Sequence, residues 1–300
     1  MFTTVLTNLI PMGIIMAIGI FARKLGIISD DVSAGMSKIL VNITLPAMLI
    51  MGMQREFTAE LLSGGLMVLG LVAAQILVFC GLGLLACILL KLPRGRRGAF
   101  ASSIAFGNVG FMGIPIIVAV FGYDALFYAA IAQIPFNLLL FSLGIGLMAK
   151  DVKRAKFRPN MAFFAALLGL AIFLIRWQIP QPIGITLHHL GGMTTPLSML
   201  IMGAMIGKQR VKELVSDKTV LFLAMLKLIA LPALTWLILR SFIADVLALG
   251  VIVTLSAMPT AVMVVICAKD NPQASEYASK AVFVTTALCL FTLPLVGLIL

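Results

Sequence analysis

The stretch N-V-G-F-M-G-I-P at residues 108–115 places two glycines and a proline in the middle of a long hydrophobic segment. A second stretch, S-A-M-P-T at residues 256–260, interrupts another hydrophobic segment at the corresponding place in the second half of the chain. Proline removes a backbone donor and clashes with the preceding turn, so we expect each helix to break within the membrane. Broken backbone at that depth is tolerated only where it is buried in protein or lines a cavity. The matched pair therefore predicts the substrate site of a secondary transporter.

The composition indicates an integral membrane protein. Hydrophobic residues make up 62% of the 300 residues and charged residues 11%, and the mean hydropathy is +1.16. A soluble chain of this length needs more polar surface. The net charge of +11 is concentrated in short runs between apolar segments, which indicates membrane topology rather than nucleic-acid binding. The four cysteines lie in apolar segments without metal-ligand spacing, so we expect neither a metal site nor a cofactor.

Hydropathy predicts ten membrane-spanning helices, each long enough to cross about 30 Å of hydrocarbon. They are expected at residues 4–22, 34–53, 61–90, 99–121, 125–149, 160–177, 191–207, 219–242, 247–268 and 277–299. Sixteen Lys and Arg residues lie in the connections that follow odd-numbered helices, and three lie on the other side. The positive-inside rule therefore places both termini outside the cytoplasm, in a multi-pass protein of the cell (inner or plasma) membrane.

Five helices in each half imply that the two halves enter the membrane in opposite senses. The second and seventh segments share M-L-I-M-G, at residues 48–52 and 199–203, shortly after Pro46 and Pro196. Pro115 and Pro259 follow these prolines at similar spacings, 69 and 63 residues. We therefore expect an all-α membrane protein of two inverted five-helix repeats, residues 1–150 and 151–300, with breaks in helices four and nine.

These features resemble the auxin efflux carrier family in its compact bacterial form. The resemblance rests on the 108–115 stretch, A-M-P at residues 257–259, L-P at residues 45–46, and K-L-x-x-x-P from Lys227 to Pro232. It implies a ten-helix transporter with a crossover of helices four and nine, a scaffold that can form a homodimer, and small organic anions as substrates.

Two departures from the plant carriers shift the expected substrate. About ten residues connect helices five and six, where the plant carriers have a long hydrophilic segment. The plant-type crossover has an asparagine in both broken helices, whereas Ser256 and Thr260 stand in the second one here. Bacterial relatives are commonly described as malonate or malate permeases, and the resemblance favours that substrate class over auxin.

The candidate binding residues lie around the two breaks. Asn108, with Gly110 beside it, can donate to a carboxylate together with the backbone amides of a helix N-terminus; alternatively, it only caps freed backbone groups. Lys227 lies nine residues beyond Lys218, about 13 Å into the membrane, where a charge costs at least about 2.5 kcal/mol. The eleven acidic residues lie in loops or at helix ends, so a carboxylate substrate would be its partner. Alternatively, Lys227 extends to the cytoplasmic interface.

Further polar residues complete the prediction. Gln133 and Asn137 are one turn apart, so they either line the cavity next to Asn108 or bond to a neighbouring helix. Ser256 and Thr260 flank Pro259 as the second-half counterparts of the Asn108 region. The residues expected at the helix breaks and the crossover are Gly113, Pro115, Pro259, Pro46 and Pro196. We expect His188 and His189 in an outer loop.

The leading hypothesis is alternating-access transport of a small mono- or dicarboxylate across the bilayer. The absence of acidic residues within the spans argues against a cation substrate and against a carboxylate sodium site. The sequence is compatible with symport with H⁺ or Na⁺, with proton coupling through Lys227 and with uniport. It determines neither the direction of transport nor the oligomeric state. The alternative is an exporter of another hydrophobic anion or metabolite on the same fold. The sequence contains no metalloprotease, hydrolase or channel-filter motif, which disfavours an enzyme and a channel.

Overall fold

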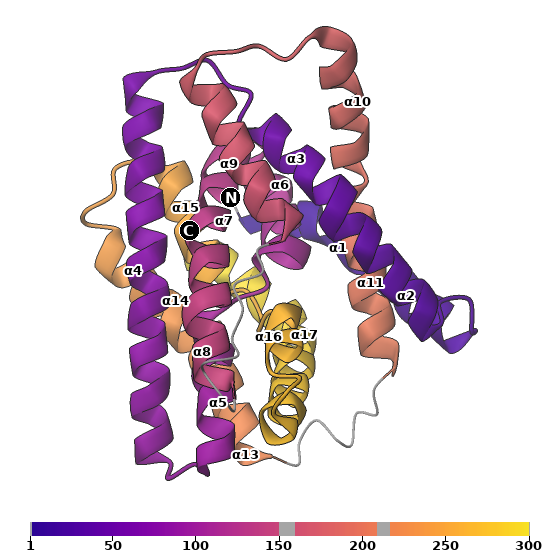
Figure 1. Cartoon of the computed structure of the whole chain (residues 1–300), viewed down its shortest axis with the longest axis vertical. Helices are drawn as coiled ribbons and strands as arrows, with labels where there is room; N and C mark the ends of the chain where they lie inside the picture. Colours follow the sequence, from indigo (N-terminus) through magenta and orange to yellow (C-terminus); the bar gives the residue numbers. More distant parts are fainter. Residues whose placement is uncertain (1, 150–159, 209–216, 300) are drawn as a thin grey trace.

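The computed structural model describes residues 2–149, 160–208 and 217–299, and within these ranges the chain is helical, without a β-strand (Figure 1). Six helical stretches of the described chain are long and apolar enough to cross a membrane: Asp30–Gly52, Ala59–Leu89, Tyr123–Met148, Gln181–Lys208, Lys218–Leu239 and Pro272–Leu295. Shorter apolar helices cover Val109–Phe121, Met161–Leu174 and Val246–Ser256. The prediction of an all-helical membrane protein is confirmed at this level.

Helix is present in each of the ten ranges expected from hydropathy. In chain order, the elements are α1 (Phe2–Lys24), α2 (Asp30–Ile39), η1 (Leu40–Thr44), α3 (Leu45–Gly52), α4 (Ala59–Leu89), α5 (Arg94–Ala105), η2 (Val109–Gly113), α6 (Ile114–Phe121), η3 (Tyr123–Ala125), α7 (Leu126–Leu139), η4 (Leu140–Gly144), α8 (Ile145–Met148), α9 (Met161–Leu174), α10 (Gln181–Gly192), α11 (Thr194–Lys208), α13 (Lys218–Met225), η6 (Leu226–Ala230), α14 (Leu231–Leu239), α15 (Val246–Ser256), α16 (Val262–Cys267) and α17 (Pro272–Ile299). The η elements are single π-turns, except η3, which is a 3₁₀ turn.

Polar side chains in the connections define where several helices begin. Ser29, Thr58, Asn160, Asp217 and Asp245 each accept a hydrogen bond from a backbone N–H in the first turn of the helix that follows. Such caps satisfy amides that have no partner within the helix. The helix starts are therefore encoded locally.

Three prolines within helices are accommodated by a wider turn. The π-turns η1, η2 and η6 end two residues before Pro46, Pro115 and Pro232, respectively. A proline ring clashes with the carbonyl one turn earlier, and a π-turn relieves that clash. The helix therefore continues through Pro46 and Pro115, and Gly113 is the last residue of the π-turn before Pro115. The expectation of breaks at Pro46, Gly113 and Pro115 was wrong.

The breaks lie at other positions. α5 ends at Ala105 and helical structure resumes at Val109, so the first break precedes Pro115 and covers residues 106–108. The second break covers residues 257–261, between α15 and α16, and it contains Pro259. Both breaks lie inside apolar sequence, as expected from the two quoted stretches.

The segment before the seventh expected helix differs from the prediction. α10 (Gln181–Gly192) includes His188 and His189, which we expected in a loop, so that expectation was wrong. Pro182 lies in the first turn of α10, where its missing N–H costs no hydrogen bond. Pro196 lies in the first turn of α11, directly after an interruption at Met193.

The helices pack into two groups. The first, called here the α1–α11 group, contains α1, α2 with η1 and α3, α9, α10 and α11; α1 packs along α11, and α3 packs against α9 and α10. The second, the crossover group, contains α4, α5 with α6, α7 with α8, α13 with α14, α15 with α16, and α17. In Figure 1, α4 lies on the left of the molecule, with the connection between α14 and α15 beyond it, and α2, α10 and α11 lie on the right.

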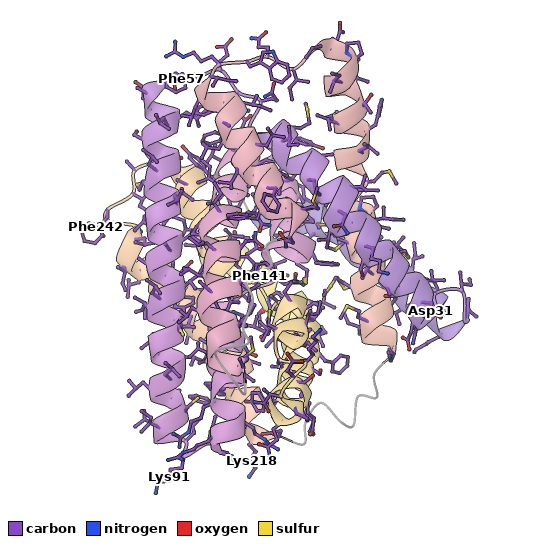
Figure 2. All side chains as sticks on the ribbon, in the orientation of Figure 1. Asp31, Phe57, Lys91, Phe141, Lys218 and Phe242 are labelled. Carbon is purple, nitrogen blue, oxygen red and sulfur yellow. The ribbon has the colours of Figure 1, made fainter. Side chains whose placement is uncertain are left out.

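One end of the molecule is basic. Lys91 and Lys218 lie at the same end, and Phe57 lies at the opposite end (Figure 2). At the basic end, Arg96 of α5 forms an ion pair with Asp217, 3.2 Å apart, which joins the starts of α5 and α13. Lys91 and Lys218 lie in connections that we expect on the cytoplasmic side.

Glycines allow α1 and α11 to approach closely. A Cβ atom at Gly203 would lie 2.0 Å from the Met16 carbonyl oxygen, and one at Gly19 would lie 2.4 Å from the Leu200 carbonyl oxygen. Association of helices in lipid depends on such close packing, because hydrocarbon surroundings supply no hydrophobic driving force.

Gly203→Ala should therefore destabilise the protein by about 1–3 kcal/mol, because the backbone of α1 must move to admit the methyl group. The measurement is thermal unfolding of the purified protein in detergent. Gly13→Ala on α1, where a Cβ atom meets nothing within 4 Å, is the matched control and should leave the transition unchanged. Equal transitions for the two variants would contradict the packing.

Candidate functional site

The two breaks are hydrogen-bonded to each other. The Asn108 amide donates to the Pro259 carbonyl at 2.6 Å, and the Ala261 amide donates to the Phe106 carbonyl at 3.0 Å. These bonds form a short antiparallel bridge between Gly107 and Thr260. A Cβ atom at Gly107 would lie 3.1 Å from the Leu255 carbonyl oxygen, so a larger residue there would push the second break away by a few tenths of an ångström. The segments singled out in the sequence therefore meet in space.

The carbonyl groups at the broken end of α5 are satisfied by groups from other helices. Thr260 Oγ1 donates to the Ser103 carbonyl at 3.0 Å, and Lys227 Nζ donates to the Ile104 carbonyl at 2.7 Å. A cation at a helix C-terminus interacts favourably with the helix dipole. Lys227 therefore stabilises the broken end of α5.

The Lys227 side chain is 1% exposed, so it does not extend to an interface. It lines a small cavity of about 20 Å³ together with Ser256 and Gly107. Its partner is a backbone carbonyl, whereas the sequence suggested a substrate carboxylate. No sequence pattern could have shown this contact, because it joins residues 123 positions apart.

The polar residues of the second break also bond to backbone. Ser256 Oγ donates to the Val253 carbonyl at 2.6 Å, and the Thr260 amide donates to Thr285 Oγ1 at 3.0 Å. Thr285, on α17, was not among the predicted site residues. Its hydroxyl donates in turn to the Ala281 carbonyl at 2.6 Å. The hydrogen bonds of these side chains therefore stabilise the second break.

Asn108 has a different environment. Its Oδ1 accepts a hydrogen bond from the Phe111 amide at 3.3 Å, which caps the η2–α6 helix. Its Nδ2 donates to the sulfur of Met202 at 3.7 Å, its one acceptor among the described residues. A thioether is a weak acceptor, and Asn108 is only 3% exposed. A buried amide donor at a helix N-terminus is therefore nearly unsatisfied.

Four predicted residues line one small cavity of about 30 Å³, which we call the Asn108 pocket: Asn108, Gly110, Gln133 and Asn137. Asn137 Nδ2 donates to Gln133 Oε1 at 3.0 Å, and Asn137 Oδ1 is buried without a partner in the described chain. None of the described residues that line this pocket is acidic. The structure thus groups these four residues and places Lys227 and Ser256 in a separate cavity.

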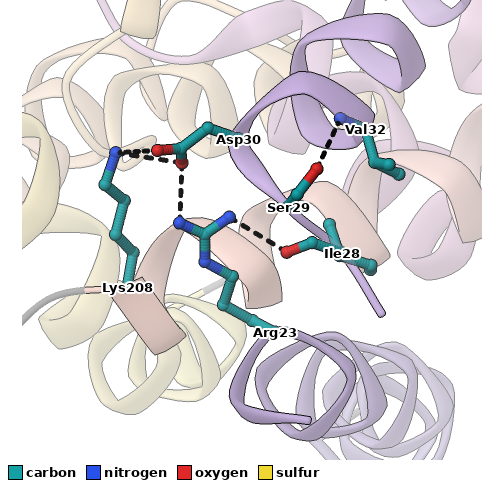
Figure 3. Close-up of polar contacts among 6 residues, drawn as sticks. All are labelled: Arg23, Ile28, Ser29, Asp30, Val32 and Lys208. Atoms are coloured by element: carbon teal, nitrogen blue, oxygen red, sulfur yellow. Dashed lines mark hydrogen bonds and ion pairs between the residues drawn. The ribbon is translucent and has the colours of Figure 1, made fainter. Parts of the chain in front are cut away.

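A larger cavity, of about 350 Å³, lies between the two helix groups. It is lined by α2 and α11 on one side and by α16 and α17 on the other. At its mouth, Asp30 pairs with Arg23 at 2.7 Å and with Lys208 at 2.9 Å (Figure 3). Arg23 also donates to the Ile28 carbonyl at 2.9 Å. Two cations and one anion therefore leave the mouth with net positive charge. The sequence analysis did not predict this cavity, because its walls come from distant segments.

Contacts between the groups close the other end of the molecule. Arg55 forms an ion pair with Asp124, and the rings of Tyr123 and His188 lie 5.9 Å apart. The Phe173 ring of α9 lies 4.8 Å from the Phe127 ring of α7. The α1–α11 group and the crossover group are therefore in direct contact at this end.

Several apolar helices, two hydrogen-bonded breaks and a cavity between two helix groups describe a multi-pass membrane protein with an internal polar site. A model of the family described as "Membrane transport protein" matches residues 4–162 and 147–296. The chain therefore belongs to this auxin efflux carrier-like family of membrane transport proteins, and the resemblance seen in the sequence is confirmed.

Two archaeal proteins are similar over almost their whole length. An uncharacterized transporter of Methanothermobacter thermautotrophicus is 26% identical over 299 residues, covering 96% of this chain and 95% of the relative. An uncharacterized transporter of Methanocaldococcus jannaschii is 23% identical over 303 residues, covering 96% of both chains.

Thr260→Val should lower stability by about 1–3 kcal/mol, because it leaves the buried Ser103 carbonyl without its donor. Thermal unfolding in detergent measures the effect. Thr194→Val is the matched control: Thr194 is buried in α11, and its hydroxyl has no hydrogen-bond partner within the described ranges, so its loss should not lower stability. If both variants unfold like the unmodified protein, the bond does not stabilise the break.

Proposed function

We propose that this protein is a secondary active transporter that moves small organic anions, mono- or dicarboxylates such as malonate or malate, by alternating access. The observation that carries the proposal is the Asn108 amide, a buried donor whose one described acceptor is a thioether sulfur. A carboxylate is a much stronger acceptor. The N-terminus of the η2–α6 helix lies beside it, and helix N-termini favour anions. Membership of a transporter family supports the same reading.

The proposed architecture is ten transmembrane helices in two inverted repeats, residues 1–150 and 151–300, with both termini outside the cytoplasm in the cell membrane. The paired breaks in corresponding segments of the two halves support it. The location of Lys91 and Lys218 at one end supports the orientation. Transport then requires the α1–α11 group and the crossover group to move relative to each other, so that the cavity at the basic end closes and the opposite end opens.

Lys227 acts in this proposal without touching the substrate. Its charge lies behind the paired breaks, bonded to Ile104, in a region of low dielectric constant where charges act over longer distances. It therefore holds the broken helix and makes the crossover electropositive.

The second candidate function is export of a more hydrophobic anion on the same fold. The 350 Å³ cavity favours it in one respect, since Val262, Val265, Ile266, Val282 and Phe283 make much of its lining apolar. Counterflow in proteoliposomes distinguishes the two: malonate inside the vesicles should accelerate uptake of labelled malonate more than an aromatic carboxylate does, and the reverse order would favour the second function.

Asn108→Asp should reduce malonate uptake into proteoliposomes at least about tenfold, because a second negative charge in the pocket repels the carboxylate by more than about 1.4 kcal/mol. Asn42→Asp adds the same charge at an exposed asparagine on η1 and should transport normally. If Asn108→Asp takes up malonate at the control rate, Asn108 does not bind the substrate.

Lys227→Met keeps an unbranched side chain, one heavy atom shorter, and removes its charge, and we expect malonate uptake to fall strongly. Lys227→Arg retains a cationic donor for the Ile104 carbonyl and should recover part of the activity. Initial uptake rates, corrected for the amount of folded protein, provide the comparison. Undiminished transport by Lys227→Met would exclude the lysine from the mechanism.

A further inference from the structure

The large cavity and the Asn108 pocket are neighbouring compartments. Met202, on α11, lines the large cavity, and its sulfur accepts the hydrogen bond of Asn108, which lines the pocket. Val262, at the start of α16, lines both compartments. The Met202 side chain therefore lies between the large cavity and the Asn108 amide, which lacks a strong acceptor.

The two compartments differ in what they can hold. The Asn108 pocket, about 30 Å³, has room for about two water molecules, so a dicarboxylate does not fit in the described state. The large cavity, about 350 Å³, is within the size range of small-molecule sites. A substrate thus reaches Asn108 only if the wall between the compartments moves.

Met202 is suited to be a movable wall. It is fully buried, yet methionine is unbranched, has three rotatable bonds and adapts to changing surroundings. Its bond to Asn108 is long and weak, so little is lost when it breaks. A carboxylate that replaces the sulfur provides a charged acceptor for the same amide and strengthens the bond.

A second observation points to a ligand in the large cavity. Thr286, on α17, lines this cavity and is only 2% exposed, and its hydroxyl has no partner within the described chain. A buried hydroxyl without a partner is unfavourable unless a ligand or water satisfies it. The preceding residue, Thr285, accepts the Thr260 amide, so the inner end of the cavity reaches the level of the paired breaks.

We propose that Met202 is the partition between an anion vestibule and the binding pocket, and that an entering carboxylate meets Thr286 first and then displaces the Met202 sulfur from Asn108. The inference rests on the proposed function for the nature of the anion. The partition itself is a property of the cavities and has a test that does not require transport.

The test measures access to the Asn108 pocket with a reporter cysteine. Ala261→Cys introduces a thiol at a buried residue that lines this pocket and not the large cavity. In a background with the four native cysteines replaced, a membrane-impermeant thiol reagent is applied at the basic end of the protein in inside-out vesicles. We expect slow labelling with Met202 present and labelling at least about tenfold faster with Met202→Ala, the size of change that an added barrier of about 1.4 kcal/mol produces.

Met199→Ala is the matched control. Met199 lies one turn earlier on α11 and is equally buried, but it lines an apolar groove formed with α1, α6 and α17. It should leave labelling slow. Fast labelling with both variants, or with neither, would overturn the partition, because the first result indicates general loosening of α11 and the second indicates that Met202 does not limit access.

Met202→Leu separates the bulk of the side chain from its sulfur. Leucine should keep labelling slow and lower the KM for malonate severalfold, since Asn108 then has no competing acceptor. Labelling as fast as with Met202→Ala would contradict the proposal.

A different result would contradict the proposed substrate class while leaving the partition intact. If Met202→Ala accelerates labelling but no small carboxylate slows it or shows counterflow, the partition stands and the carboxylate assignment is wrong.

Discussion

Backbone groups within a membrane have no water to bond, so every carbonyl and amide freed by a helix break must find a partner in the protein. In this protein, the break after α5 and the break after α15 satisfy each other through the Asn108–Pro259 and Ala261–Phe106 bonds. Lys227 and Thr260 supply the remaining donors to the end of α5. The positions of α6 and α16, and of the cavities beside them, depend on this mutual satisfaction.

Against that background, the few unsatisfied groups are informative. The donor of Asn108, the acceptor Oδ1 of Asn137 and the hydroxyl of Thr286 lie at the two neighbouring compartments, and the hydroxyls of Ser102 and Ser103, at the end of α5, are also buried without a partner in the described chain. Their cost in stability is of the kind that functional sites carry. The division of roles follows from it: Lys227 and Thr260 hold the backbone, and Asn108 and its neighbours are available to a ligand.

Local sequence signals predicted much of this arrangement. Hydropathy located the helices, and the residues beside the first break, with the Gln133–Asn137 spacing, identified four residues that share a pocket. The sequence could not distinguish a break from a π-turn, because the same proline chemistry produces both; Pro115 follows a π-turn, and Pro259 lies in a break. The partner of Lys227 and the wall formed by Met202 depend on contacts between distant helices, which no local pattern records.

The most direct measurement of the central claim is stabilisation of the purified protein by small carboxylates. A ligand that binds only the folded state raises stability by about 2.7 kcal/mol at one hundred times its dissociation constant. The account predicts that malonate or a related carboxylate raises the melting temperature with rising concentration, and that Asn108→Ala abolishes the increase. An undiminished increase in that variant, or no increase with any small carboxylate, would contradict the claim that the paired breaks form an anion site.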